Sequence, residues 1–159
     1  MWNYPARESS GSPAVSQGVV YIGSFADYIY ALDGQTGSEI WAYSPVGAAD
    51  SAPAVANGVV YLGTWDHNFY ALRAHTGTLL WRYTTEAYIG SSPAVANGII
   101  YVGSDDGTVY AFALLPGSQR MSPSKQPDLT MLRPDPDLKA LEASRGSDNE
   151  GGNQARPRQ

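Results

Sequence analysis

The sequence has 159 residues, no cysteine and a formal net charge of −5. The absence of cysteine excludes disulfides, thiolate metal sites and thiol nucleophiles. No apolar run approaches the ~20 residues of a membrane span, and residues 1–4 lack the basic start and apolar stretch of a signal peptide. The compartment therefore stays undetermined.

Charge and aromatic residues divide the chain near residue 115. Residues 1–115 contain every aromatic residue, with three basic against nine acidic residues, which excludes an electrostatic footprint for nucleic acid. Residues 116–159 contain no aromatic residue and are rich in Pro, Ser and charge. Such a segment cannot bury enough apolar surface to offset its chain entropy, so we expect a disordered tail over 116–159.

Residues 1–115 repeat at a spacing of 40. The repeated positions include a proline, two tyrosines and a glycine: Pro13, Pro53, Pro93; Tyr21, Tyr61, Tyr101; Tyr30, Tyr70, Tyr110; Gly23, Gly63, Gly103. A fixed period of this length indicates one supersecondary unit copied along the chain. The copies run over 11–50, 51–90 and 91–115.

The chain begins with the end of such a unit. Trp2 and Tyr4 match Trp41 and Tyr43, which close the first full copy. We therefore expect residues 1–10 to form the fourth strand of a unit.

The middle copy predicts four short strands, over 54–56, 59–63, 69–72 and 79–83. Asn57-Gly58 is the signature of a type I′ hairpin turn, which needs positive φ at both central residues. Four antiparallel strands in about 40 residues form one propeller blade. The sequence therefore predicts an all-β fold of stacked blades.

The third copy predicts only three strands, so the array contains about three blades. Known propeller rings have at least four blades. We therefore expect self-association or a fragment of a larger propeller, with the N-terminal strand of one chain completing the third blade of another.

The turn before each closing tryptophan resembles the tryptophan-docking motif of pyrroloquinoline-quinone-type (PQQ-like) propellers, A-x-D-x-x-T-G-x-x-x-W. The matching residues are Ala31, Asp33, Thr36, Gly37 and Trp41, then Ala71, Thr76, Gly77 and Trp81, with Arg73 in place of the Asp. This bacterial family includes outer-membrane assembly lipoproteins and sensor domains, often extracytoplasmic. The resemblance implies that Trp41 and Trp81 pack against the adjacent blade, near its Ala and Thr-Gly segment.

Two functions are compatible with this resemblance. One is a non-catalytic scaffold or binding module for a protein or small ligand, with no cofactor and no catalytic or metal-binding residue. The alternative is the remnant of a PQQ-dependent quinoprotein dehydrogenase, a class that needs about eight blades and holds the quinone over a tryptophan beside calcium. The lack of a cysteine pair favours the first.

Few single residues point to a site. His67 and His75 fall in predicted turns, where exposure is the ordinary state. Asp105-Asp106 supplies far fewer oxygens than the six to eight that calcium takes. Phe25 and Trp65 occupy the same repeat position in a turn, and we identify them as candidate surface contacts for a partner.

Overall fold

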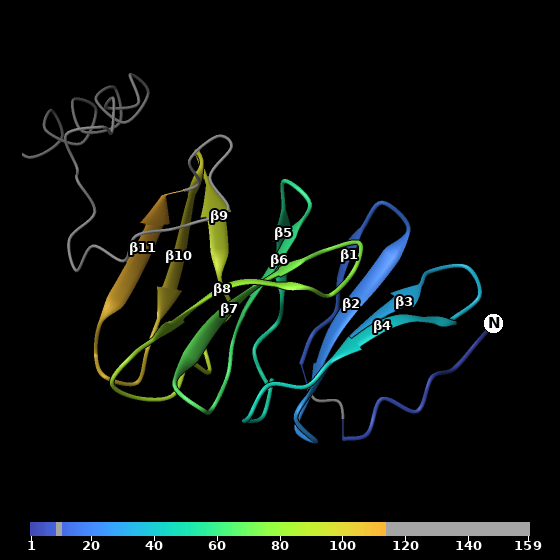
Figure 1. The fold of residues 1–159 in the computed structure, drawn as a ribbon, viewed down its shortest axis with the longest axis horizontal. Coiled ribbons are helices and arrows are strands. Elements are labelled where there is room, and N and C mark those ends of the chain that lie inside the picture. The colour runs from blue at the N-terminus through green and yellow to red at the C-terminus, as the bar shows by residue number, and fades with distance from the viewer. Residues whose placement is uncertain (9–10, 114–159) are drawn as a thin grey trace, which may run out of the picture. The chain divides into compact units, whose positions relative to one another are not determined.

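The computed structural model describes residues 1–8 and 11–113. These residues form strands and no helix, so none of them builds a helix that crosses a membrane (Figure 1). They all belong to one compact unit, Met1–Pro127. The disordered tail expected over 116–159 lies outside the described residues, and the domain boundary at 115 stays a prediction.

The strands form three antiparallel sheets, each in sequence order. The first contains β1 (Ala14–Ser16), β2 (Val19–Ser24), β3 (Tyr28–Asp33) and β4 (Glu39–Tyr43). The second contains β5 (Ala54–Ala56), β6 (Val59–Gly63), β7 (Asn68–Arg73) and β8 (Leu79–Thr84). The third contains β9 (Ala94–Ala96), β10 (Ile99–Gly103) and β11 (Val109–Ala113). The four-stranded blade predicted from the middle copy is confirmed.

The hairpin turns have the predicted backbone. Asn57 and Gly58 both have positive φ, 51° and 74°, and Asn97 and Gly98 repeat these values at 50° and 74°. Gln17 adopts the same left-handed conformation, with a φ of 51°, although glutamine favours this region of backbone angles less than asparagine does. The register that follows places Ala54 opposite Tyr61 and fixes which side chains face each neighbouring sheet.

The fourth strand expected in residues 1–10 does not form over residues 1–8, the part of this segment that the structure describes. Residues 1–6 have no regular secondary structure. A fourth strand needs the edge of a third strand to pair with, and no described strand forms backbone pairs with this segment. The segment lies against the first sheet through its side chains instead.

Two apolar cores join the three sheets, which stand in a row in Figure 1. The first core joins the first and second sheets and contains Tyr21, Ile29, Ala31, Trp41, Ala49, Val60, Leu62, Tyr70, Leu72 and Ala74. The second joins the second and third sheets and contains Tyr61, Phe69, Ala71, Ile89, Ile100, Val102 and Phe112. The second sheet therefore buries one face against the first sheet and the other against the third, as in stacked blades.

Candidate functional site

The indole of Trp41 docks onto the second sheet. Its Nε1 donates a hydrogen bond of 2.8 Å to the carbonyl oxygen of Ala74. Its six-membered ring covers Gly77, where an added Cβ would lie 2.7 Å from Trp41 Cδ2. Gly77 also has a positive φ of 69°. Close approach and left-handed backbone together leave only glycine suitable at this position.

Trp2 makes the same contact one repeat earlier. Its Nε1 donates to the carbonyl oxygen of Gly34 at 3.1 Å. A Cβ on Gly37, whose φ is 74°, would lie 2.5 Å from Trp2 Cδ2. The N-terminal segment therefore supplies the docking tryptophan of a preceding blade, although it forms no strand.

Asp33 organises the turn that receives Trp2. Its carboxylate accepts hydrogen bonds from the backbone N–H of Thr36 (2.7 Å), the Thr36 hydroxyl (2.9 Å) and the backbone N–H of Gln35 (3.0 Å). These bonds, led by the one from the Thr36 backbone, lower the pKa of Asp33. Arg73, the copy of Asp33, has no carboxylate to accept such bonds. The backbone of the turn is nevertheless the same, because Gly77 N–H donates to the Arg73 carbonyl oxygen at 2.8 Å, as Gly37 N–H does to that of Asp33.

Each of the two motif alanines lies opposite the tryptophan of its own sheet, on the neighbouring strand. Ala31 pairs with Trp41 and Ala71 with Trp81, and both alanines are fully buried. Trp81 packs on Phe112 of the third sheet, with ring centroids 5.5 Å apart. The residues that would follow Phe112 in a third docking turn lie outside the described range.

The two candidate surface contacts come together in the structure. The rings of Phe25 and Trp65 meet edge to face at 5.4 Å. Trp65 also stacks on Tyr88 at 5.9 Å, and Tyr88 meets His67 at 5.0 Å. Phe25, Trp65 and Tyr88 are 37%, 44% and 49% exposed. We call Phe25, Trp65, His67 and Tyr88 the aromatic row.

Three loops build this row at one end of the sheets, between β2 and β3, between β6 and β7 and between β8 and β9. In each sheet, the turn between the second and third strands donates a backbone N–H to the loop that precedes the first strand. Phe25 and Trp65 lie on two of these turns. The pairs are Phe25 to Glu8 (3.1 Å), Trp65 to Ala48 (3.0 Å) and Asp105 to Tyr88 (2.9 Å). We call these turns and the loops bonded to them the rim. Sequence reasoning missed Tyr88, because its repeat copies, Glu8 and Ala48, are not aromatic.

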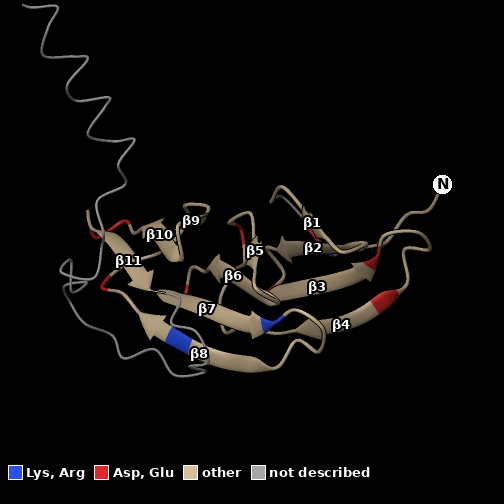
Figure 2. Cartoon of the chain, turned by 90° about the horizontal axis from the view of Figure 1, so that it is seen from above, with Lys and Arg blue, Asp and Glu red and all other residues tan. Residues whose placement is uncertain are grey.

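The rim carries the whole net charge of the described residues. Its charged side chains are Arg7 against Glu8, Asp27, Asp50, Asp66, Glu86, Asp105 and Asp106. Elsewhere Arg73 and Arg82, the blue segments of β7 and β8 in Figure 2, balance Asp33 and Glu39. The aromatic row therefore lies in a field that attracts cations.

Two rim carboxylates hold their turns through a tyrosine four residues later. Asp66 accepts from the hydroxyl of Tyr70 (2.7 Å), the Asn68 side-chain amide (2.8 Å) and the Thr64 hydroxyl. Asp106 accepts from the Tyr110 hydroxyl (2.8 Å) and the backbone N–H of Thr108 (2.9 Å). The Asp-x-x-x-Tyr spacing, repeated at 40 residues, is the sequence signal that could have identified this role.

These bonds predict a loss of stability in acid. Burial of Asp66 alone would raise its pKa, but the hydrogen bonds from Thr64, Tyr70 and Asn68 outweigh burial and lower the pKa. Since the folded pKa lies below the unfolded one, the stabilisation is complete above the unfolded pKa of ~3.9 and is lost as pH falls through the folded pKa.

The measurement is urea unfolding between pH 7 and pH 2.5, for the wild type and for Asp66→Asn. We expect the free energy of unfolding of the wild type to fall below about pH 4. The Asp66→Asn variant should be less stable at pH 7 and should lose less on acidification. Parallel curves for the two proteins would contradict the role of Asp66.

The histidines do not converge with other reactive groups. His67 belongs to the aromatic row, and His75 is exposed in the turn between β7 and β8. Among the described residues no group of three His, Asp or Glu side chains is placed to hold a metal ion. Trp2 and Trp41 each place the indole over a glycine of the sheet on which it docks.

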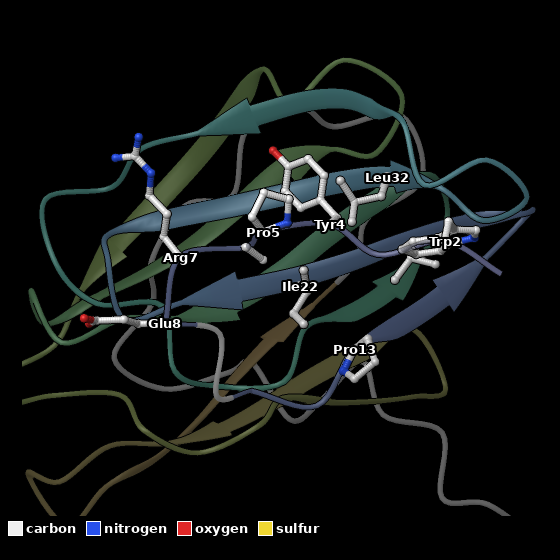
Figure 3. A pocket seen from close by; sticks show the side chains of 10 residues that line it. Trp2, Tyr4, Pro5, Arg7, Glu8, Pro13, Ile22 and Leu32 are labelled. Atoms are coloured by element: carbon white, nitrogen blue, oxygen red, sulfur yellow. The ribbon is translucent and has the colours of Figure 1, made fainter.

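One pocket of about 610 Å³ opens on the first sheet (Figure 3). The N-terminal segment forms one wall with Trp2, Tyr4 and residues 5–8. Pro13, Val20, Ile22 and Leu32 form the other. The lining is mostly apolar, so the pocket suits apolar side chains rather than a charged substrate.

Comparison with known proteins places these features in one family. A family model described as outer membrane protein assembly factor BamB matches residues 1–127. A search of the curated proteins found no match.

Solved structures with the same fold include enzymes and a protein of another kind. BamB from Moraxella catarrhalis is 21% identical, with a TM-score of 0.60 over 69% of this chain and 35% of that one. A quinohemoprotein alcohol dehydrogenase from Pseudomonas putida HK5 is 30% identical, with a TM-score of 0.61 over 68% and 19%. The enzyme of the same name from Comamonas testosteroni is 28% identical, with a TM-score of 0.57 over 68% and 19%. The chain thus spans about a third or less of each of these structures.

Proposed function

The chain belongs to the PQQ-like propeller family whose model is described as outer membrane protein assembly factor BamB, and on this premise we propose that it is a non-catalytic module that binds another protein through its rim. The observation that carries the proposal is the aromatic row. Side chains from three loops, far apart in sequence, form one continuous exposed aromatic surface. Aromatic residues are the commonest anchors of protein interfaces.

The charge of the rim indicates the chemistry of the partner. The rings of Trp65 and Tyr88 are 44% and 49% exposed, the carboxylate of Glu86 lies on the loop of Tyr88, and that of Asp105 lies on the turn bonded to this loop. An arginine or lysine side chain gains from both, by cation–π attraction and by charge pairing. The proposed contact segment of the partner is therefore basic.

The quinoprotein alternative has less support in the described residues. The dehydrogenases share the fold. Their chemistry needs a quinone held beside a metal, and the described side chains offer no three-residue donor set for that metal. We therefore derive no catalytic step for this chain.

Panning a phage-displayed random peptide library on the full chain tests the rim. We expect enriched peptides to contain Arg or Lys beside an apolar residue. Their affinity, measured by calorimetry, should fall at least about tenfold on Trp65→Ala, since an aromatic anchor is worth ~2 kcal/mol or more.

The control is Ile40→Ala, which removes a side chain as exposed as Trp65, at 44%, from β4. This variant should bind the peptides as the wild type does. Enrichment of acidic peptides, or equal binding by Trp65→Ala and the wild type, would contradict the proposal.

A further inference from the structure

The third sheet exposes the face that the first two sheets bury. At one repeat position Ile29 and Phe69 are fully buried, whereas Val109 is 73% exposed. At another, Tyr21 and Tyr61 are 3% and 2% exposed, whereas Tyr101 is 38% exposed. We call this surface, formed by β10 and β11, the outgoing face.

On the first sheet no described sheet packs on the opposite face, although the N-terminal segment lies against it and Leu32 is only 3% exposed. Val20, Ile22 and Leu32 are copies of Val60, Leu62 and Leu72, which are fully buried in the core between the first and second sheets. In the first sheet these three side chains line the pocket instead (Figure 3).

Val15 lies on the same side of the first sheet and is 69% exposed. Its copies, Val55 and Val95, pack against the two inter-sheet cores. We call the surface formed by Val15, Val20, Ile22 and Leu32 the incoming face.

The N-terminal segment already supplies part of what the incoming face lacks. Tyr4 meets Tyr30 at 5.3 Å, as Tyr43 meets Tyr70 at 5.8 Å. Together with the Trp2 hydrogen bond to Gly34, this reproduces the contacts of a fourth strand. The side chains that would fill the pocket are those that a preceding sheet would supply from its second and third strands.

The core between the first and second sheets shows which side chains these are. Tyr21 of β2 and Ile29 of β3 pack against the copies of the pocket residues, and the Tyr21 hydroxyl donates to the carbonyl oxygen of Ala74 at 3.3 Å. The same oxygen accepts from Trp41 Nε1. Gly34 is the copy of Ala74, and its oxygen already accepts from Trp2.

We propose that the outgoing face docks on the incoming face of a second copy of this chain. Tyr101 and Val109 fill the pocket, and the Tyr101 hydroxyl donates to the Gly34 carbonyl oxygen. The second copy is favoured over other occupants because this chain forms the same interface twice between its own sheets, with the same residue types on both sides. The interface joins different faces, so two chains bound reciprocally close into a ring of blades.

This inference goes beyond the proposed function, because it uses neither the rim nor the aromatic row. It is tested on the full chain by sedimentation velocity, with three matched valine substitutions at exposed sites. Val109→Asp places a carboxylate on the outgoing face and Val15→Asp on the incoming face. Val46→Asp, at a loop residue that is 81% exposed, is the control.

We expect the wild type and Val46→Asp to associate into a species of twice the 17.0 kDa of one chain. Val109→Asp and Val15→Asp should each weaken association at least about tenfold, because each buries an unpaired carboxylate. Since each variant keeps one intact face, an equimolar mixture of the two should recover a dimer with a single junction. If the wild type forms a larger species, and the two face variants and their mixture behave as described, the result supports the docking and changes only the number of copies in the ring.

Three results would overturn the proposal. One is a wild type that stays monomeric, with its faces covered by another segment of the chain or open for a different partner. Another is undiminished association of Val109→Asp or Val15→Asp. The last is a mixture that behaves as the sum of its components, which would indicate an interface between like faces. Circular dichroism of both variants distinguishes lost association from lost folding.

Discussion

Replacing Trp41 with alanine is expected to destabilise the fold by ~3–5 kcal/mol, the usual cost of removing a buried tryptophan. Trp41 is only 8% exposed and belongs to the core between the first and second sheets. The substitution leaves a cavity over Gly77 and removes the hydrogen bond to the Ala74 carbonyl oxygen. Because a lone blade is not stable by itself, the loss of this contact affects the cohesion of the array.

Trp65→Ala is the matched control for this experiment. Trp65 has the same side chain, but it is 44% exposed and its ring contacts are with Phe25 and Tyr88. We expect it to cost about 1 kcal/mol. Urea unfolding of both variants and the wild type, at one protein concentration, gives the comparison. Equal costs would show that docking of Trp41 does not hold the sheets together.

Trp41→Phe divides the cost of this docking into its parts. Phenylalanine fills some of the volume over Gly77 but has no N–H for Ala74. The oxygen of Ala74 still accepts from the Tyr21 hydroxyl, so it is not left without a partner. We therefore expect most of the stability to be retained, with Trp41→Phe closer to the wild type than to Trp41→Ala.

The strands of the blades could be predicted because local chemistry and repetition agree. Asn57-Gly58 determines a turn that needs no distant partner, and the copy at Asn97-Gly98 tests the same inference again.

Two features of the structure depend on packing between sheets and could not be predicted from a local sequence pattern. A strand was expected within residues 1–10, because Trp2 and Tyr4 match a strand elsewhere, but pairing needs a partner strand that the described chain does not provide.

A bulge at the same place in two sheets was also not predicted. Trp81 pairs with Ala71 but Leu79 pairs with Leu72, so Leu80 is the extra residue. The copy in the first sheet leaves out Ile40 in the same way. The alternation of side chains along a regular strand therefore breaks just before the tryptophan of each fourth strand. The bulge re-aims the indole toward the next sheet, which is a requirement of packing rather than of strand propensity.

The candidate site was predictable in part for the same reason. Phe25 and Trp65 share a repeat position, so the fold had to place them on neighbouring turns, where their rings now meet. Tyr88 could not be found this way, because the position varies among the copies. Its place in the aromatic row depends on the loop that bonds to Asp105.

Replacing Gly63 with alanine is expected to cost about 3 kcal/mol, near the upper end of the range for overpacking a core. Gly63 lies at the end of β6, where its N–H and carbonyl both bond to the Ser51 hydroxyl, at 2.9 and 3.0 Å. A Cβ there would lie 2.0 Å from Ile89 Cγ2 and 2.7 Å from the Ile89 carbonyl oxygen. Ile89 is fully buried, so the loop cannot move aside without opening the second core.

The repeat provides the control for this prediction, since Gly103 is the copy of Gly63. Its N–H and carbonyl bond to the Ser91 hydroxyl at 2.9 and 2.7 Å, but among the described residues the atom nearest to an added Cβ is Ser91 Oγ, at 3.5 Å. Gly103→Ala should therefore be neutral, or stabilising by up to ~1 kcal/mol through the reduced entropy of the unfolded chain. Thermal or urea unfolding separates the two variants. Similar effects of both would mean that the strand position of the glycine, and not the approach of Ile89, is what excludes a side chain at Gly63.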